Sequence, residues 1–204
     1  MMRRTKEDAE KTREDLLDAA LTVFSQKGYE SSRLEDVAEA VGVTRGAIYH
    51  HFGNKADLYM ALIEGASTQG EDLIKKAAEE GGTFAEIISR ILTYYFSLLE
   101  DNRRFRDVVG LTLFKTGISH DLEALARRRY DEARILVENI GRLFQAAIAN
   151  GQLRPDLDPE AAARALLAYQ NGLAMLWLAN PDAFSIKADA PALVDVFLRG
   201  IVMK

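Results

Sequence analysis

Two short runs of helical apolar spacing, separated by one glycine, constrain the fold of this chain most strongly. The apolar residues of the first run are Leu34, Val37, Ala38 and Val41. In the second run Ile48 and Phe52 lie four residues apart, so both side chains fall on one face of a helix. Gly42 ends the first run, and Thr44 is a suitable N-cap for the second. The sequence therefore predicts a helix-turn-helix with its core over residues 33–52.

The residues on either side of this motif also predict helices. Apolar spacing between residues 6 and 27 indicates a first helix, and Gly28 is its expected end. Ser32 and Glu35 have the S-x-x-E spacing of a capping box, which would open the first helix of the motif. After the motif, a longer helix is expected from residue 56 to about residue 80.

The remaining sequence favours helices as well. Proline is rare, with 4 residues in 204, and long runs of Val, Ile and Thr are missing. Candidate helices cover residues 84–100, 103–114, 121–149, 160–180 and 192–202. We therefore expect an all-α fold of about nine helices. Residues 1–55 form its N-terminal three-helix helix-turn-helix domain, and the helix at 56–80 opens a larger C-terminal helical domain over residues 56–204.

A stretch without acidic residues coincides with the second helix of the motif. Residues 43–55, VTRGAIYHHFGNK, contain none, although the whole chain has 31 Asp and Glu against 26 Lys and Arg. In a helix-turn-helix the second helix enters the major groove of DNA, where carboxylates would repel the phosphates. We therefore predict double-stranded DNA as a partner. We expect the acids of the preceding helix to lie outside the contact window, the part of the motif that meets DNA. These acids are Glu35, Asp36 and Glu39.

Individual contacts follow from the side-chain chemistry of this region. The predicted DNA contacts are Ser32, Arg33, Thr44, Arg45, Gly46, Tyr49, His50 and Lys55. Arg45 has the fork of N–H donors that fits either a guanine edge or a phosphate. Gly46 leaves room for a close approach, and Lys55 is placed for the DNA backbone at the start of the next helix. Arg33 can contact a phosphate or stay solvated, and both alternatives remain open.

Residues 12–63 resemble the N-terminal domain of the TetR family of transcriptional repressors almost from end to end. Within them, VAEAVGVTRGAIYHHFGNKADLY, residues 37–59, is close to the family signature. Residues 150–184, NGQLRPDLDPEAAARALLAYQNGLAMLWLANPDAF, resemble the branch of AcrR- and TtgR-type repressors of multidrug efflux pumps. Arg33 departs from the family pattern, in which many members have Thr or Ser at the start of this helix.

This resemblance implies a homodimer joined through the last two helices. It also implies a palindromic operator and a small hydrophobic ligand that releases the repressor from it. An alternative remains open, because the same fold and motif serve other regulators. In that alternative the chain represses or activates metabolic genes in response to a fatty acyl compound or another metabolite.

Two further sets of residues are predicted for the C-terminal domain. The candidate walls of the ligand pocket are Tyr94, Phe96, Phe105, Phe114, Tyr130, Gln170, Asn171 and Trp177. The candidate dimer-interface residues are Leu166, Leu173, Leu176, Leu193, Val196 and Phe197. Each aromatic residue also fits ordinary core packing, and Gln170 and Asn171 need polar partners in an apolar helix. The terminal helices have more apolar surface than one chain is expected to bury, which favours a four-helix bundle between two chains.

Other classes of function receive no support from the sequence. The absence of cysteine excludes thiol catalysis, and no catalytic residue, cofactor or metal site is predicted. His50 and His51 are adjacent, so they point about 100° apart on a helix and cannot share one metal ion. The charged N-terminus is unlike a signal peptide, and residues 165–180 are too short to cross a bilayer comfortably. We expect a cytoplasmic protein without a membrane partner, and not an enzyme.

Overall fold

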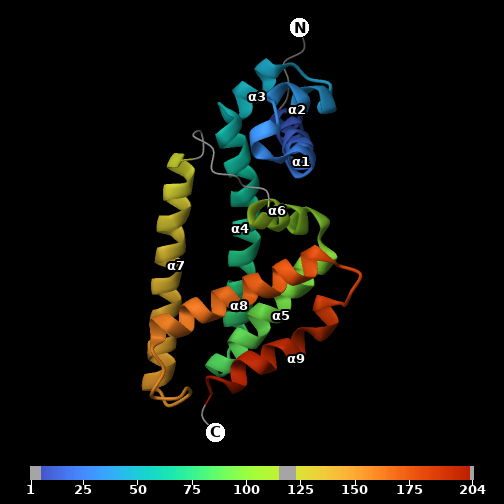
Figure 1. The fold of residues 1–204 in the computed structure, drawn as a ribbon. Coiled ribbons are helices and arrows are strands. Elements are labelled where there is room, and N and C mark those ends of the chain that lie inside the picture. The colour runs from blue at the N-terminus through green and yellow to red at the C-terminus, as the bar shows by residue number, and fades with distance from the viewer. Residues whose placement is uncertain (1–5, 115–122, 203–204) are drawn as a thin grey trace. The chain divides into compact units, whose positions relative to one another are not determined.

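The computed structural model describes residues 6–114 and 123–202, and this part of the chain forms nine α-helices (Figure 1). The all-α prediction is therefore confirmed for the described residues. The packing divides the chain into two compact units, and each unit is described by itself. No helix within the described ranges is both long enough and apolar enough to cross a membrane.

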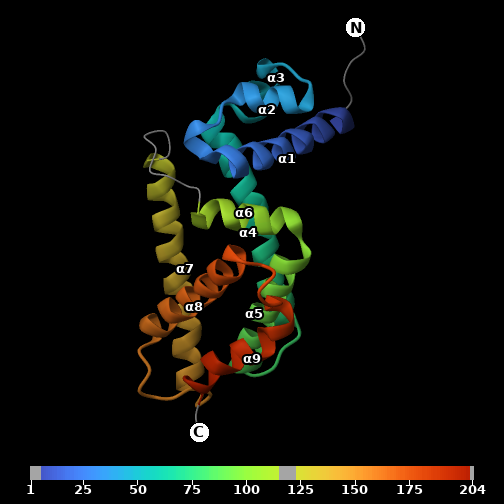
Figure 2. The ribbon, with the colours of Figure 1, turned by 45° about the vertical axis from the view of Figure 1, so that its right-hand side comes forward.

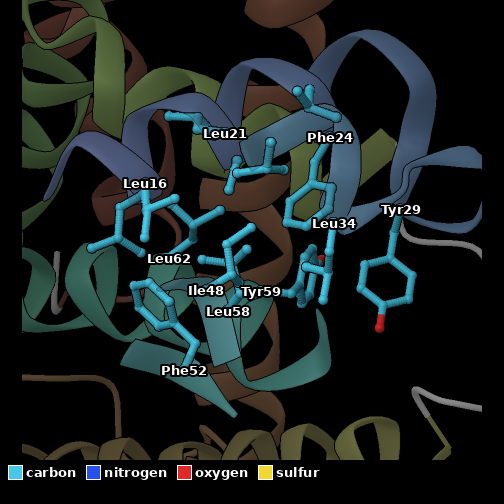
Figure 3. Packing of buried hydrophobic residues seen from close by; sticks show 14 of the residues in the cluster. Leu16, Leu21, Phe24, Tyr29, Leu34, Ile48, Phe52, Leu58, Tyr59 and Leu62 are labelled. Atoms are coloured by element: carbon cyan, nitrogen blue, oxygen red, sulfur yellow. The ribbon is translucent and has the colours of Figure 1, made fainter. Parts of the chain in front are cut away.

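The first unit contains the described parts of residues 1–68 and 103–125. Its helices are α1 (Lys6–Ser31), α2 (Leu34–Val41), α3 (Arg45–Phe52), the first part of α4 (Lys55–Glu79) and α6 (Arg103–Phe114). Figure 3 shows part of the core, to which α1 contributes Phe24, α3 contributes Ile48 and α4 contributes Leu58. Val108 and Leu111 of α6 join the same core. This core extends beyond the domain boundary expected at residue 55, and the assignment of the two domains to separate roles stays a prediction.

Ion pairs also join α6 to α1 within the first unit. The Arg104 guanidinium lies 2.9 Å from Glu14 Oε2 through Nη1, and 3.3 Å from Asp18 Oδ1 through Nε. Both carboxylates lie on the side of α1 that faces α6. The polar contacts therefore supplement the apolar contacts that hold α6 in this unit.

The turn between α2 and α3 forms as predicted. Gly42 adopts the left-handed conformation that favours glycine, with φ 71° and ψ 30°. Its N–H donates to the Glu39 carbonyl at 3.1 Å, and the Val43 N–H donates to the Ala38 carbonyl at 3.0 Å. Thr44 occupies the N-cap of α3 with an extended backbone. The predicted helix-turn-helix is confirmed.

The capping box predicted from Ser32 and Glu35 was wrong. α2 begins one residue later than this box requires, with Arg33 at its N-cap. The carboxylate that accepts a hydrogen bond from the Arg33 N–H, at 3.0 Å, belongs to Asp36. Ser32 is buried, and its hydroxyl donates to the carbonyl of Gly28, where the helical backbone of α1 is broken. The serine hydroxyl is used at the end of α1 and therefore does not cap α2.

The second unit contains the described parts of residues 69–102 and 126–204. Its helices are the remainder of α4, α5 (Phe84–Asp101), most of α7 (Glu123–Ala149), α8 (Pro159–Ala179) and α9 (Ile186–Arg199). α5 and α9 lie side by side (Figure 1, Figure 2). Phe96 of α5, Trp177 of α8 and Val194 of α9 are buried in this unit. Asp121, the predicted first residue of α7, lies outside the described residues.

The last helix begins earlier than predicted. The sequence predicts a helix over residues 192–202, whereas α9 starts at Ile186 and contains Pro191. The Ser185 side chain caps its first turn, and the Glu100 carboxylate of α5 accepts hydrogen bonds from the Ser185 hydroxyl at 2.9 Å and the Lys187 N–H at 3.0 Å. These contacts stabilise the first turn of α9 although Pro191, further along, has no N–H to donate.

Candidate nucleic-acid interface

α3 has a buried apolar face and an exposed polar face. Ile48 is fully buried and Phe52 is 8% exposed, as the spacing predicts. The exposed residues on and beside this helix are Thr44, Arg45, Gly46, Tyr49 and His50. Hydroxyl, guanidinium and imidazole groups are therefore exposed on and beside α3, and these groups can hydrogen-bond to phosphates or base edges.

Arg45 is held by side chains from two helices. Its Nη1 lies 2.6 Å from Glu35 Oε1 on α2, and its Nε donates to the Tyr49 hydroxyl at 3.1 Å. Nη2 donates to the same hydroxyl, and the guanidinium carbon lies 5.1 Å from the centroid of the Tyr49 ring. The hydrogen bonds to Tyr49, and then the charge of Glu35, raise the pKa of Arg45. The guanidinium is therefore cationic at physiological pH.

The position of Glu35 contradicts the expectation that the acids of α2 lie outside the contact window. The turn at Gly42 brings α2 and α3 together, so the Glu35 carboxylate reaches the Arg45 guanidinium. The pair is formed across two helices, and the spacing of residues within either helix does not reveal it. One carboxylate therefore lies on the surface that we expect to contact DNA.

An open hollow with three cationic side chains lies where α2, α3 and the start of α4 meet. It is lined by Tyr29, Arg33, Leu34, Glu35, Arg45, Tyr49, Asn54, Lys55 and Ala56. Four of the predicted contact residues are in this lining, and the cations there outnumber the single carboxylate. Such a concave surface suits phosphate oxygens. Ser32 is buried instead, so we remove it from the proposed contacts.

The start of α4 fixes one side of this hollow. Lys55 Nζ lies 4.3 Å from the centroid of the Tyr29 ring and 3.4 Å from the carbonyl oxygen of Glu30. Asn54 Oδ1 accepts a hydrogen bond from the Asp57 N–H at 2.9 Å and so caps α4. Sequence reasoning missed Asn54, although its spacing to Asp57 was a usable capping signal.

Four of the residues predicted for a ligand pocket are divided between the two units. Phe105 is buried and Phe114 is 49% exposed, and both lie on α6 in the first unit. In the second unit, Tyr130 is 74% exposed and Asn171 is also exposed to solvent. Residue type alone suggested these positions, and it does not specify which helix face meets a cavity. Their role in a ligand pocket stays a prediction.

The other four predicted pocket residues all lie in the second unit. They are Tyr94, Phe96, Gln170 and Trp177. Phe96 and Trp177 are buried in the apolar core, which agrees with the alternative of ordinary core packing. Burial raises the pKa of Tyr95, and a hydrogen bond with Gln170 partly offsets this rise. Gln170 therefore has an internal polar partner, Tyr95, which the sequence reasoning did not single out.

The residues predicted for the dimer interface differ in their exposure. Leu166 is buried within the second unit, which contradicts its prediction as surface available to a partner chain. The partly buried residues are Leu173, Leu193 and Phe197. Leu176 on α8 and Val196 on α9 are 66% and 67% exposed. α9 packs against α5, and its buried residues Ile186, Ala190 and Val194 are not available to a partner chain.

The fold and this surface together define a DNA-binding regulatory protein, because a helix-turn-helix exposes its second helix beside grouped cations. No group of three His, Asp or Glu side chains in the described part of the chain could hold a metal ion. Residues 16–62 match the bacterial regulatory proteins of the tetR family, and residues 85–202 match the C-terminal domain of BetI-type transcriptional repressors. The chain therefore belongs to the TetR family of bacterial regulatory proteins.

Three known proteins are similar along nearly the whole chain. TtgR, an HTH-type transcriptional regulator of Pseudomonas putida, is 34% identical over 97% of this chain and 95% of its own. NalD, the secondary repressor of the MexAB-OprM multidrug efflux pump in Pseudomonas aeruginosa, has a TM-score of 0.86 at 30% identity, over 98% of this chain and 100% of its own. SmeT, the repressor of the Stenotrophomonas maltophilia multidrug efflux pump SmeDEF, has a TM-score of 0.78 at 26% identity, over 97% of this chain and 93% of its own. The resemblance to the AcrR- and TtgR-type branch is confirmed.

Proposed function

We propose that this chain is a homodimeric repressor that controls genes for an efflux pump. In this proposal it binds a palindromic operator through α3 of each protomer, and a small hydrophobic ligand releases it. The repressor acts in the cytoplasm, where the DNA is, and catalyses no reaction. The names of NalD and SmeT support the efflux role, because both are repressors of multidrug efflux pumps.

The observation that carries the DNA-binding part is the polar face of α3. Arg45 and Tyr49 are exposed on this helix, while Ile48 fixes it to the core. A two-fold dimer would present two such helices to the two half-sites of a palindrome. Leu176 of α8 and Val196 of α9 are the exposed apolar residues that we propose for the dimer contact.

Ligand release is proposed as a linked equilibrium. SmeT has been solved in complex with triclosan, which supports a hydrophobic ligand for the present chain. α4 is one continuous helix with residues in both units, so we propose it as the element that couples ligand binding to the spacing of the recognition helices. Coupling between two binding sites is reciprocal, so the operator must weaken ligand binding by the same factor. Equal ligand affinity for free and operator-bound protein would contradict this mechanism.

Fluorescence anisotropy tests the proposal directly. The purified protein is titrated into a labelled duplex from the intergenic region upstream of its own gene, with excess random DNA present. Lipophilic cations, phenolic compounds and fatty acyl compounds are then added in turn. We expect binding that resists the competitor and is relieved by lipophilic cations or phenolics.

Other outcomes of this titration separate the alternatives. Relief by fatty acyl compounds alone would favour the metabolic regulator, which is the second candidate function. Specific binding that no compound relieves would leave the DNA-binding role and remove the support for ligand release. Failure to bind this region specifically would contradict control of the neighbouring genes.

A further inference from the structure

Glu35 is a carboxylate on the surface that we propose for DNA, where its charge opposes binding to phosphates. Its Oε1 lies 2.6 Å from Arg45 Nη1, and the two side chains are 55% and 56% exposed. An ion pair as exposed as this contributes little to the stability of a fold. The pair therefore calls for an explanation in recognition and not in stability.

The contacts of Arg45 leave a defined part of its guanidinium available. The group has five N–H donors, one on Nε and two on each terminal nitrogen. The Nε donor and one Nη2 donor are directed to the Tyr49 hydroxyl, and Nη1 lies 2.6 Å from the Glu35 carboxylate. At least one N–H therefore remains on each terminal nitrogen. A bidentate contact with O6 and N7 of guanine needs that number of donors.

An arginine that is held from two helices differs in its DNA contacts from one that moves freely. A mobile guanidinium can reach any nearby phosphate, and such contacts carry no sequence information. Glu35 on α2 and Tyr49 on α3 restrict Arg45 before DNA arrives, so less side-chain freedom is lost when it contacts a base. The negative charge of Glu35 also weakens binding to every sequence equally.

We propose that Glu35 is a positioning residue that, together with Tyr49, directs Arg45 to a base edge, so that the protein gains sequence discrimination at the expense of overall DNA affinity. Glu35 acts through Arg45 and not by its own contact with DNA. This inference rests on the DNA-binding function proposed above and adds a residue that determines its specificity.

The test compares four full-length variants with the unmodified protein. They are Glu35→Gln, Glu39→Gln, Arg45→Ala and the double variant Glu35→Gln/Arg45→Ala. Glu39→Gln is the matched control, because Glu39 is an exposed carboxylate one turn further along α2. The probes are the duplex that the unmodified protein selects from a randomised library, and the same duplex with each guanine replaced in turn. Anisotropy gives the affinity for each probe at several salt concentrations, and thermal unfolding checks that each variant is folded.

We expect Glu35→Gln to bind the mismatched duplexes more tightly than the unmodified protein does. Its discrimination at one guanine of each half-site should fall by about tenfold, the size of effect that one bidentate base contact supports. Glu39→Gln should strengthen binding to every probe by the same factor, so that discrimination between the probes is unchanged. In the Arg45→Ala background, Glu35→Gln should also change all probes equally, because the residue that it positions is gone.

The results that would overturn the inference are distinct from failure of the proposed function. If the unmodified protein selects a sequence, and Glu35→Gln discriminates between matched and mismatched duplexes as well as the unmodified protein, only the inference fails. A further loss of discrimination caused by Glu35→Gln in the Arg45→Ala background would also contradict it. If the unmodified protein selects no sequence from the library, the DNA-binding function is wrong, and the inference fails with it.

Discussion

At the scale of single residues, Arg45 is the side chain on which the proposed recognition depends most. Replacing it with alanine should weaken operator binding by about 1–3 kcal/mol and relax specificity at one position of each half-site. Anisotropy on the selected duplex and on its single-base variants measures both effects. Arg33→Ala is the comparison, because Arg33 lines the same hollow and a contact from it to a phosphate would contribute to binding of all sequences alike. An equal loss on all sequences for Arg45→Ala would identify Arg45 as a phosphate contact.

Gly46 offers a test that separates folding from DNA binding. A Cβ at this position would meet only the Thr44 Oγ1 atom, at an ordinary 3.6 Å. Gly46→Ala should therefore stabilise the fold by about 0.5–1 kcal/mol, because alanine favours helix. Operator affinity should nevertheless fall, because we expect the DNA to approach the backbone closely here. Urea unfolding and anisotropy on the same preparation measure the two effects.

Gly110→Ala provides the control for this substitution. Gly110 lies on α6 of the same unit, and a Cβ built on it would meet no atom within 4 Å. This change should raise stability in the same way and leave operator affinity unchanged. Unchanged operator affinity in Gly46→Ala would show that DNA does not need a glycine at this position.

The sequence predicted the exposure of the α3 residues because that exposure follows from spacing alone. Ile48 and Phe52 are four residues apart and buried, and Tyr49 and His50 between them are exposed. The partner of Arg45 could not be predicted in this way. Glu35 lies on another helix, and only the angle set by the turn at Gly42 brings the two side chains together.

At the scale of helices, the ends were predictable where the chain supplies its own signal. Gly42 and Thr44 mark the boundaries of the motif, and both occupy the predicted positions, although the Thr44 side chain makes no capping hydrogen bond. The predicted start of the last helix, residue 192, directly follows Pro191, whereas in the structure this proline lies within a helix whose first turn is well capped. Part of that cap comes from Glu100 on a different helix, which local sequence does not reveal.

This helix cap leads to a prediction about stability. Glu100→Gln keeps the size of the side chain but removes the charge that strengthens its bonds to Ser185 and the Lys187 N–H. The free energy of unfolding should fall by about 1–2 kcal/mol, as measured by urea titration followed by circular dichroism. Glu138→Gln is the control, because it breaks an exposed pair with Arg134 in the interior of α7, away from a helix N-terminus, and should cost less than about 0.5 kcal/mol. Equal losses in both variants would argue against a special role for Glu100.

At the scale of the whole molecule, the proposed dimer depends on exposed residues of α8 and α9. Leu176→Glu should leave the protomer folded, because this side chain is 66% exposed, but should convert the dimer into monomers. Size-exclusion chromatography with light scattering measures the mass. Operator affinity should fall in parallel, because one recognition helix would then bind without its partner.

Leu143→Glu on α7 changes a similarly exposed leucine outside these helices, and this control should remain dimeric. A dimeric Leu176→Glu would place the interface elsewhere.

The grouping of the helices into units could be predicted only in part. The helix-turn-helix follows from spacing between near neighbours in sequence, whereas α6 joins the first unit through Arg104, Val108 and Leu111. Those contacts connect segments that are distant in sequence, and the apolar spacing of α6 does not specify its partner. The same reason explains why the sequence does not place Phe105, a predicted pocket residue, in the first unit.

The single tryptophan of the chain gives the two units different optical signatures. Trp177 is buried in the second unit, and its indole N–H donates to the Phe184 carbonyl at 3.1 Å. Emission excited selectively from tryptophan therefore reports the state of the second unit, whereas circular dichroism sums the helices of both. If the two signals change at different denaturant concentrations, the units unfold in separate steps, and coincident curves indicate one cooperative transition. The protein thus contains its own spectroscopic label for one of its two halves.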